Sequence, residues 1–335
     1  MKLLFELSKE YDTIPKSEII SCLKGENLTF NIDHSDNDVL IVKSDISKNQ
    51  INILSQRLSF SFSINKLLFS SSNSIEDIKE YAQDVIIESN GSIAINYKNR
   101  SKSIDSKPIL ELIGDLFTKN KIVNLEDPEL IIRVIITDDF THVGLNVAEI
   151  NRSEFEKRKV QNRPFFSPIS LHPKLARALV NFSQIKRGDT LIDPFCGTGG
   201  ILIEAGLIGI KLIGCDIEDK MIEGCNKTLN YYNINKVKLI KTDIGDIENY
   251  VTEVDSIVTD LPYGRATTTK GEDIESLYNR AFLNFSKILK KDHIAVIVSP
   301  NKDLYSIGKK YFSLIDHHEI KVHRSLTRHI GIFKR

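Results

Sequence analysis

The chain has 335 residues, which exceeds one domain of ordinary size, and its apolar content of 41% with only nine prolines is typical of ordered globular protein. Its 45 basic and 45 acidic residues cancel, so no global field attracts a polyanion, and any nucleic-acid partner must be held by a local basic surface. No apolar run is long enough to cross a membrane, and Glu6 interrupts the first apolar segment before a secretory core forms.

The cysteines form no C-x-x-C pair, which argues against a zinc knuckle and against a disulfide framework. They are Cys22, Cys196, Cys215 and Cys225. The histidines near the C-terminus do not have the spacing of a metal-ligand set. The sequence therefore predicts a cytoplasmic protein without a membrane segment and without a metal.

Residues 1–56 alternate short apolar strands with helical patterns. Strands are expected at 2–7 and 39–43, and helices at 17–23 and 46–54. No residues with evident chemistry stand in this part. We predict a small α+β domain.

Residues 57–150 show the same alternation of strand and helix patterns. The patterns predict a strand-rich run at 58–69, helices at 75–85 and 109–116, and paired strands at 129–136 and 142–147. A second α+β domain follows from this reading.

Residues 151–166 are polar, become basic towards their end and contain Pro164, which is typical of a linker between domains. Basic residues in such positions usually belong to a solvated surface. If RNA is the partner, those of the linker are the first candidates to contact phosphate, and two earlier residues are weaker candidates. The set is Arg158, Lys159 and Arg163, with Lys98 and Arg100.

Residues 167–335 alternate buried strands with helices, as in a doubly wound α/β sheet. The helices are expected at 173–182, 201–205, 217–231 and 274–289. The strands are expected at 191–192, 211–215, 237–240, 256–259 and 294–298, with a closing antiparallel pair at 310–323 and 327–333.

A glycine-rich turn joins the first of these strands to its helix. Gly197, Gly199 and Gly200 permit a tight turn and the close approach of a ligand to the backbone. No Gly-Lys-Ser/Thr follows, as a phosphate loop requires, and Leu202 stands where a dinucleotide fingerprint has its third glycine. The acidic Asp193 before the glycines disfavours a pyrophosphate and favours a cationic ligand.

Two further carboxylates follow later strands. Asp216 lies about 20 residues beyond the glycines, where a carboxylate accepts hydrogen bonds from both ribose hydroxyls of a nucleoside. It can equally cap the helix that follows. Asp243, at the end of the third strand, is expected to accept the amino group of adenine or to cap the next turn.

The tetrapeptide D-L-P-Y follows the fourth strand and suits methylation of an amino group on a base. The lone pair of such a nitrogen is delocalised into the ring, and acceptors placed against its two N–H bonds favour a more reactive, pyramidal nitrogen. Asp260 supplies one acceptor and the backbone carbonyl of Leu261 the other. Pro262 restricts Leu261 to extended conformations, and Tyr263 offers a flat surface for an unstacked base.

These motifs resemble those of known enzymes. The loop D-P-F-C-G-T-G-G at 193–200 resembles the cofactor loop of class I S-adenosylmethionine (SAM)-dependent methyltransferases. Together with R-P-F-F at 163–166, L-H-P-K-L-A-R-A-L at 171–179 and D-L-P-Y-G-R at 260–265, it resembles the THUMP-domain tRNA guanine-N2-methyltransferases of the archaeal guanosine-10 type. Leu261 departs from the more usual proline, which keeps the carbonyl but adds an N–H that needs a partner.

The resemblance implies a domain order and a partner. We expect a ferredoxin-like α+β domain at 1–56, an RNA-binding THUMP domain at 57–150, a linker at 151–166 and a class I methyltransferase domain with a Rossmann-like sheet at 167–335. The partner would be tRNA, with one or two methyl groups added to the 2-amino group of a guanosine. The sequence gives no indication of an accessory subunit.

The resemblance also implies a site. The catalytic residues would be Asp260, Leu261, Pro262 and Tyr263. The SAM-binding residues would be Asp193, Pro194, Cys196, Gly197, Thr198, Gly199, Asp216, Ile217, Asp243 and Ile244.

Two other readings remain open at this stage. An adenine amino methyltransferase acting on DNA or RNA uses the same tetrapeptide, although the long N-terminal α+β region stands where a duplex-reading insertion would be expected. A non-catalytic RNA-binding protein with a relic fold is the second, and the three intact carboxylates Asp193, Asp216 and Asp260 argue against it.

Overall fold

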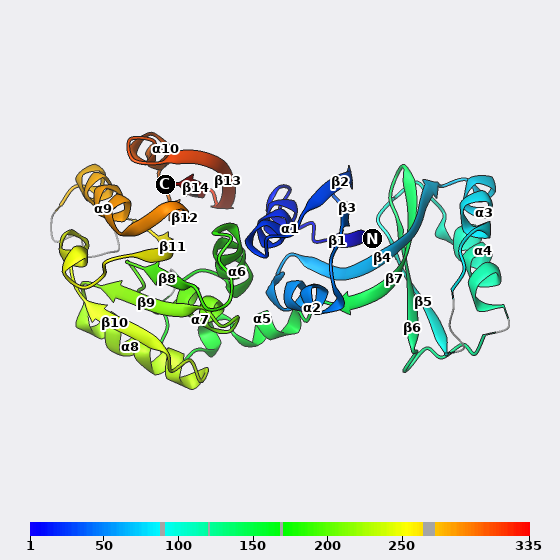
Figure 1. Ribbon diagram of the computed structural model, residues 1–335, viewed down its shortest axis with the longest axis horizontal. Helices are drawn as coiled ribbons and strands as arrows, with labels where there is room; N and C mark the ends of the chain where they lie inside the picture. The colour runs from blue at the N-terminus through cyan, green and yellow to red at the C-terminus, as the bar shows by residue number, and fades with distance from the viewer. Residues whose placement is uncertain (88–90, 120, 168–169, 264–271) are drawn as a thin grey trace. The chain divides into compact units, whose positions relative to one another are not determined.

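The computed structural model describes residues 1–87, 91–119, 121–167, 170–263 and 272–335, so that Gly264 and Arg265 of the D-L-P-Y-G-R motif lie outside it. The chain forms two compact units, each built on a seven-stranded sheet (Figure 1). Unit 1 comprises Met1–Asp12, Leu28–Gln56 and Ser61–Asn151, and unit 2 comprises Thr13–Asn27, Arg57–Phe60 and Arg152–Arg335.

The sheet of unit 1 includes strands from both expected N-terminal domains. Among its described strands, β5 and β6 are the one parallel pair, and β1 pairs with β4 across the expected boundary at 56/57. That boundary, like the division into four domains, stays a prediction. The order is β2 (Phe30–Ser35), β3 (Val39–Ser44), β1 (Lys2–Leu7), β4 (Ser61–Ser72), β7 (Phe140–Glu149), β6 (Leu130–Ile136) and β5 (Ile93–Asn99).

The sheet of unit 1 curls, because residues from strands that are far apart in its order share one buried cluster. Ile135 of β6 packs with Leu4 of β1 and with Val39 and Ile41 of β3. The long strand β4 has register irregularities against both of its neighbours, and such irregularities bend a strand. The helices α3 (Ile75–Gln83) and α4 (Ser106–Thr118) share a second core with β5, β6 and β7, whereas α2 (Lys48–Arg57) precedes β4.

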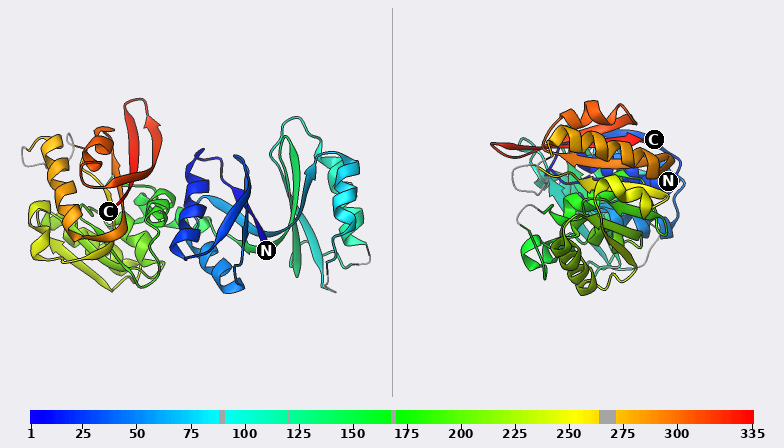
Figure 2. Two further views of the ribbon diagram at one scale, coloured as in Figure 1. Left: turned by 45° about the horizontal axis from the view of Figure 1, so that its top comes forward. Right: turned by 90° about the vertical axis from the view of Figure 1, so that its left-hand side faces the viewer.

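The sheet of unit 2 confirms the expected doubly wound arrangement. Its first five strands are parallel, and β14 and β13 add an antiparallel pair at one edge, whose turn projects from the sheet (Figure 2). The order is β10 (Val237–Lys241), β9 (Lys211–Asp216), β8 (Thr190–Asp193), β11 (Val254–Asp260), β12 (Leu289–Ser299), β14 (Leu326–Lys334) and β13 (Ser313–His323). The order reverses between β8 and β11, and ligands of such sheets bind where it does.

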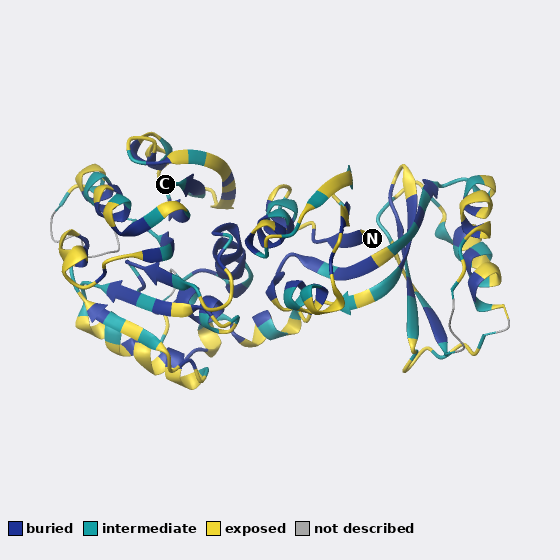
Figure 3. Cartoon of the chain, in the orientation of Figure 1, coloured by how far each residue is buried: buried dark blue, intermediate teal, exposed yellow. Residues whose placement is uncertain are grey.

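Helices cover this sheet, and the strands between them are largely buried (Figure 3). On α9 (Ile274–Ile288), apolar residues at helical spacing pack with Ile257 of β11 and Ile297 of β12 in the main core of the unit. Helix α10 (Asp303–Gly308) and the 3-10 helix η2 (Ile244–Asn249) contribute to the same core. The helices α7 (Gly200–Gly206) and α8 (Asp219–Tyr231) contact β8, β9 and β10, and α6 (Pro173–Phe182) packs on α7.

The N-terminal helix α1 (Ile14–Gly25) groups with unit 2 and packs on α6. The buried carboxylate of Glu18 accepts hydrogen bonds from the backbone of Ser59 (3.0 Å) and from the side-chain amide of Asn181 on α6 (2.9 Å). Arg57 donates to the same Asn181 side chain (3.2 Å) and to the carbonyl of Ile185 (2.6 Å). Three separate parts of the sequence therefore complete one buried polar network.

The expected linker belongs to unit 2 from Arg152 onwards. It contains the short helix α5 (Ser153–Lys157) and the 3-10 helix η1 (Val160–Asn162). Just after α5, Arg158 donates to the buried carboxylate of Glu204 on α7 at 2.8 Å, and Arg177 of α6 pairs with the same carboxylate at 2.9 Å. A buried carboxylate with two arginines compensates the desolvation of each group and fixes the end of the linker.

All four cysteines are free and buried, and the compartment expected from them stays a prediction. Within the described part of the chain, no helix combines the length and the apolar character that crossing a membrane requires.

Candidate active site

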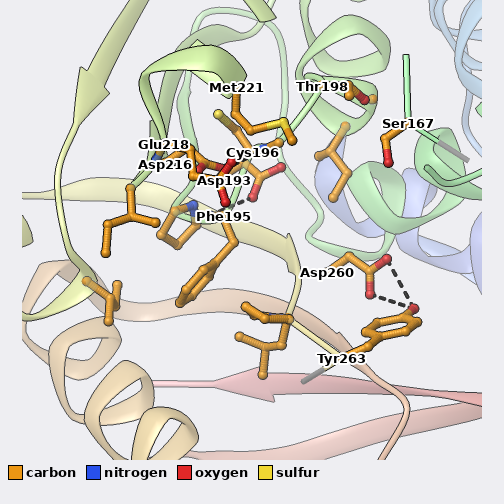
Figure 4. Close-up of a pocket in the computed structure, with 18 of the residues that line it drawn as sticks. Ser167, Asp193, Phe195, Cys196, Thr198, Asp216, Glu218, Met221, Asp260 and Tyr263 are labelled. Atoms are coloured by element: carbon orange, nitrogen blue, oxygen red, sulfur yellow. Dashed lines mark hydrogen bonds between the residues drawn. The ribbon is translucent and has the colours of Figure 1, made fainter. Parts of the chain in front are cut away.

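A cavity of about 390 Å³ lies in unit 2, at the carboxyl ends of the parallel strands (Figure 4). Asp193 ends β8, Asp216 ends β9 and Asp260 ends β11, and all three line the cavity. Its volume falls within the range of pockets that hold small organic ligands, about 300–1,000 Å³.

The glycine turn forms one wall of the cavity. Gly197 and Gly199 have φ of 49° and 80°, in the left-handed region that favours glycine. A Cβ atom on Gly199 would lie 2.7 Å from the sulfur of Cys225, so this position also lacks space for a side chain. Helix α7 begins at the next residue, and its first N–H groups are therefore free of partners within the helix.

Asp193 is 2% exposed and accepts hydrogen bonds from the hydroxyl of Thr259 (2.7 Å) and from the N–H of Phe195 (3.2 Å). Both donors are neutral, and burial raises the pKa of its carboxyl to about 7. A cationic ligand in the cavity would stabilise the ionised form of this carboxyl. The electrostatics therefore fit the positive charge that the sequence predicted for the ligand.

Asp216 holds the turn from the other side. Its two carboxylate oxygens accept the N–H groups of Gly197 and Glu218, each at 3.0 Å, and burial raises the pKa of its carboxyl. Each of these oxygens has a second lone pair, with which it can accept a hydroxyl of a ligand. Asp243 caps η2 through the N–H of Gly245 at 2.8 Å and pairs with Arg280 of α9.

The backbone of the D-L-P-Y tetrapeptide is held by identifiable partners. The N–H of Leu261, the group that a proline would lack, donates to the carbonyl of Val298 on β12 at 2.9 Å. The carbonyl of Pro262 accepts from the hydroxyl of the buried Tyr278 at 2.9 Å, and Ser299 donates to that hydroxyl at 3.2 Å. The N–H that the departure from the more usual proline adds is therefore paired.

Asp260 and Tyr263 lie at the opposite side of the cavity from Asp216 (Figure 4). The hydroxyl of Tyr263 donates to the carboxylate of Asp260 at 2.9 Å, and Nε of Arg328 donates to the tyrosine oxygen at 2.9 Å. Burial raises the pKa of the Asp260 carboxyl to about 6, although Arg328 and the Tyr263 hydrogen bond oppose this rise. In this arrangement, the Asp260 carboxylate, which is the expected acceptor for a base amino group, already accepts the hydroxyl of Tyr263.

The residues predicted for the site lie together. All four residues of the tetrapeptide line the cavity, as do all of the predicted SAM-binding residues except Gly199. Gly199 belongs to the same turn and packs against Cys225. The individual roles of the site residues stay predictions. Thr259, Tyr278, Arg280 and Arg328 also hold the site, and sequence analysis did not single them out. Only Thr259, as the neighbour of Asp260, was within reach of a sequence argument.

Several basic residues expected at RNA have other partners. Arg158 is bound to Glu204, and Arg163 is 4% exposed with its Nε donating to the carbonyl of Arg158 at 3.0 Å. The side chain of Arg100 is 9% exposed and pairs with Glu6 at 2.8 Å. Their contacts with phosphate stay predictions, and the burial of each guanidinium argues against them.

The other two basic residues remain open to solvent. Lys98 is exposed on β5, and Lys159 is partly exposed and pairs with Glu156. Their contacts with RNA stay predictions.

Comparison of the sequence with protein families gives two matches. Residues 161–330 match the family described as the RMKL-like methyltransferase domain. Residues 32–227 match a family described as DNA methylase, a range that ends before Asp260 and therefore leaves out the tetrapeptide.

A whole-length relative is more specific. The tRNA (guanine(10)-N2)-dimethyltransferase of Methanothermobacter thermautotrophicus is 34% identical over 346 residues, with 100% of both chains covered.

Solved structures share the fold of the chain. TrmN from Thermus thermophilus has a TM-score of 0.57 at 15% identity, with 100% of both chains covered. A protein solved in complex with SAH has a TM-score of 0.52 at 14% identity, over 99% of this chain and 97% of that one. Identities this low establish the architecture only.

Proposed function

The chain belongs to the family of the tRNA (guanine(10)-N2)-dimethyltransferases, and from this membership we propose that it is a SAM-dependent enzyme that methylates the 2-amino group of guanosine 10 in tRNA. One observation supports the proposal above the others. The glycine turn and the tetrapeptide D-L-P-Y line the same cavity, so a methyl donor and a base amino group can meet there.

The chain's own residues account for donor binding. SAM supplies a methyl group on a positively charged sulfur. Asp193 offers a buried carboxylate to positive charge on the ligand, and Asp216 offers oxygens to the ribose hydroxyls, while Asp243 and Ile244 flank the space for adenine.

The tetrapeptide accounts for the acceptor. Asp260 and the carbonyl of Leu261 accept the two N–H bonds of the guanine amino group and favour a pyramidal nitrogen. A carboxylate is too weak a base to remove an aniline-like proton beforehand, so the proton leaves as the nitrogen gains the methyl group. The base displaces the hydroxyl of Tyr263 from Asp260, and the tyrosine ring stacks on the base.

The N-terminal part accounts for selection of tRNA. We assign 1–56 to a ferredoxin-like domain, 57–150 to a THUMP domain that binds tRNA, 151–166 to the linker and 167–335 to the methyltransferase domain. Lys98 and Lys159 are the remaining candidates for phosphate contacts. The enzyme is proposed to act in the cytoplasm and without a metal in catalysis.

The test uses the purified full chain with SAM and two tRNA transcripts that differ only in the 2-amino group of the base at position 10. One carries guanosine at position 10, and the other carries inosine, which lacks the 2-amino group. We expect N2-methylguanosine and then N2,N2-dimethylguanosine in the first tRNA by nucleoside mass spectrometry, and neither in the second. Equal methylation of both transcripts would contradict the proposed target atom.

The match to a DNA methylase family supports a second candidate, adenine amino methylation. The same assay with duplex and single-stranded DNA in place of tRNA separates the two. Formation of N6-methyladenine in DNA, at a rate equal to that of methyl transfer to tRNA, would favour this second candidate.

A further inference from the structure

Three side chains of types that bind metal ions lie together in unit 1, whereas the cavity described above belongs to unit 2. His34 is on β2, Asp36 follows that strand, and His142 is on β7. One ligand atom from each of the three lies within 4.8 Å of the others. Sequence analysis predicted no metal from the cysteines and the C-terminal histidines, and it did not consider these three residues. His34 and His142 are far apart in the chain and lie close together only in the folded sheet.

His142 is the most informative member. It is 1% exposed, its Nδ1 lies 2.8 Å from the hydroxyl of Ser70, and its Nε2 is buried without a hydrogen-bond partner among the described residues. An unpaired buried polar atom destabilises the fold, because it has lost its hydration without gaining a partner. A metal ion bound at Nε2 would remove this destabilisation, and the Ser70 contact at the other nitrogen is the kind of partner that orients a metal-binding imidazole.

His34 and Asp36 face the same place and are accessible. Nε2 of His34 lies 2.9 Å from Oδ2 of Asp36, and their side chains are 30% and 32% exposed. The other oxygen of Asp36 accepts the N–H groups of Asp38 and Val39 at 2.7 and 2.8 Å, which fixes the orientation of the carboxylate. The exposure leaves a route for an ion and room for water as a further ligand.

We propose that His34, Asp36 and His142 form a site for a divalent transition-metal ion, with Zn²⁺ as the preferred ion and a water molecule as its fourth ligand. Two imidazoles and a carboxylate are a common zinc donor set, and around tetrahedral zinc such atoms lie about 3.4 Å apart. His34 and Asp36, whose ligand atoms are 2.9 Å apart, therefore need to separate slightly to admit the ion, and His142 needs to approach them by about an ångström. On binding, the Nε2 proton of His34 moves to Nδ1 or to solvent, and the ion takes its place beside Asp36.

The site would join strands that are separated in the order of the sheet. Strands β3, β1 and β4 stand between β2 and β7. An ion held by residues from both would fasten the edge strand β2 to the curled part of the sheet. We therefore expect the ion to act on the stability of unit 1 and not on methyl transfer, so that this inference stands or falls independently of the proposed function.

The test is competition for Zn²⁺ between the tag-free full chain, freed of metal by a chelator, and a chromophoric chelator. We expect one ion per chain and a higher unfolding temperature with Zn²⁺. His34→Gln and Asp36→Asn change partly exposed residues, and each should weaken binding by about 100-fold or more. Ser70→Ala, which removes the partner of His142 but no ligand, should weaken it by about 10-fold.

The matched control is His293→Gln. His293 lies 3.7 Å from Asp255 in a histidine–carboxylate pair of unit 2 that is not part of the cluster, and this change should leave zinc binding unaltered. Binding of Co²⁺ should give the visible absorption of a tetrahedral ion without thiolate charge transfer, which excludes the cysteines as ligands. Absence of saturable binding, or affinity unchanged in both His34→Gln and Asp36→Asn, would overturn the proposal.

Discussion

At the scale of single residues, the site depends on the hydrogen bonds of the residues that directly follow β11. Leu261 donates its N–H to Val298, and Pro262 is held through its carbonyl by Tyr278. These bonds position the backbone, and they leave the side chain of Asp260 to meet the substrate. The carboxylate itself is the one group of the tetrapeptide that can be altered without disturbing this framework.

The change Asp260→Asn keeps the shape of the side chain and removes its charge. We expect the rate of methyl transfer to fall by about 100-fold or more, because an acceptor for the developing positive charge is lost. SAM affinity, measured by calorimetry, should stay near that of the unmodified chain.

Asp255→Asn is the matched control, since Asp255 lies at the other end of the same strand and accepts from Thr190 and Lys290. A rate for Asp260→Asn equal to that of Asp255→Asn would refute the assigned role.

The change Tyr263→Phe tests the hydrogen bond to Asp260 while keeping the aromatic ring. This bond lowers the pKa of Asp260, which burial sets at about 6, so its removal should raise that pKa further. Protonated Asp260 has lost the negative charge that stabilises the positive charge developing on the nitrogen, and the acid limb of the rate profile should therefore move to higher pH.

The measurement is kcat/KM for tRNA against pH at saturating SAM, because this quantity reports the enzyme before the base displaces the Tyr263 hydroxyl from Asp260. Arg328→Gln should move the limb in the same direction, because the arginine also lowers the pKa of Asp260. A shift towards lower pH in either variant would contradict this account.

At the scale of elements, the unit formed by β8, the glycine turn and α7 has a conformation that only particular residues allow. Gly199 has a left-handed backbone and faces the sulfur of Cys225. The turn is also tied to β9, since Cys196 donates its N–H to the carbonyl of Cys215 at 2.8 Å. A distortion of the turn would therefore be transmitted to the strand that ends at Asp216.

Replacing Gly199 by alanine should lower the free energy of unfolding by more than the ~1–2 kcal/mol of a left-handed alanine, because the new Cβ also meets Cys225. Gly188→Ala is the control: Gly188 has φ of 93°, but a Cβ there meets nothing within 4 Å. Denaturant unfolding and SAM affinity are the measurements. Equal losses of stability in the two variants would show that the contact with Cys225 has no effect.

At the scale of the whole molecule, the catalytic unit includes residues from the beginning of the chain. Helix α1 and Arg57 share a buried network with Asn181 of α6. A fragment limited to 152–335 would expose this surface of α6 and leave Asn181 without its partners.

We expect the fragment 152–335 to unfold at a temperature ~5–10 °C below that of the catalytic unit in the full chain. This corresponds to a loss of ~2–3 kcal/mol at ~2–4 °C per kcal/mol for a domain of this size. Differential scanning calorimetry gives the comparison, and SAM binding by the fragment serves to show that it folds. An unchanged unfolding temperature would mean that α1 contributes nothing to this unit.

The amino-acid sequence alone determined the parts of this protein whose requirements are local. Glycines at 197 and 199 reflect backbone conformations, the carboxylates at 193, 216 and 260 follow strand ends, and apolar spacing indicates the strands and helices of the doubly wound sheet. Strand β2 was not predicted, and no residue of it is fully buried, so that it lacks the long apolar pattern of a core strand.

The tertiary structure decided what depends on residues far apart in the chain. It buried Arg158 and Arg163 in unit 2, and it brought Arg328 to Tyr263. It also joined 1–56 and 57–150 through one sheet and collected His34, Asp36 and His142 in it. A charged side chain has the same sequence signature on a surface as beside a buried counter-ion, and only the fold determines which partner lies within reach.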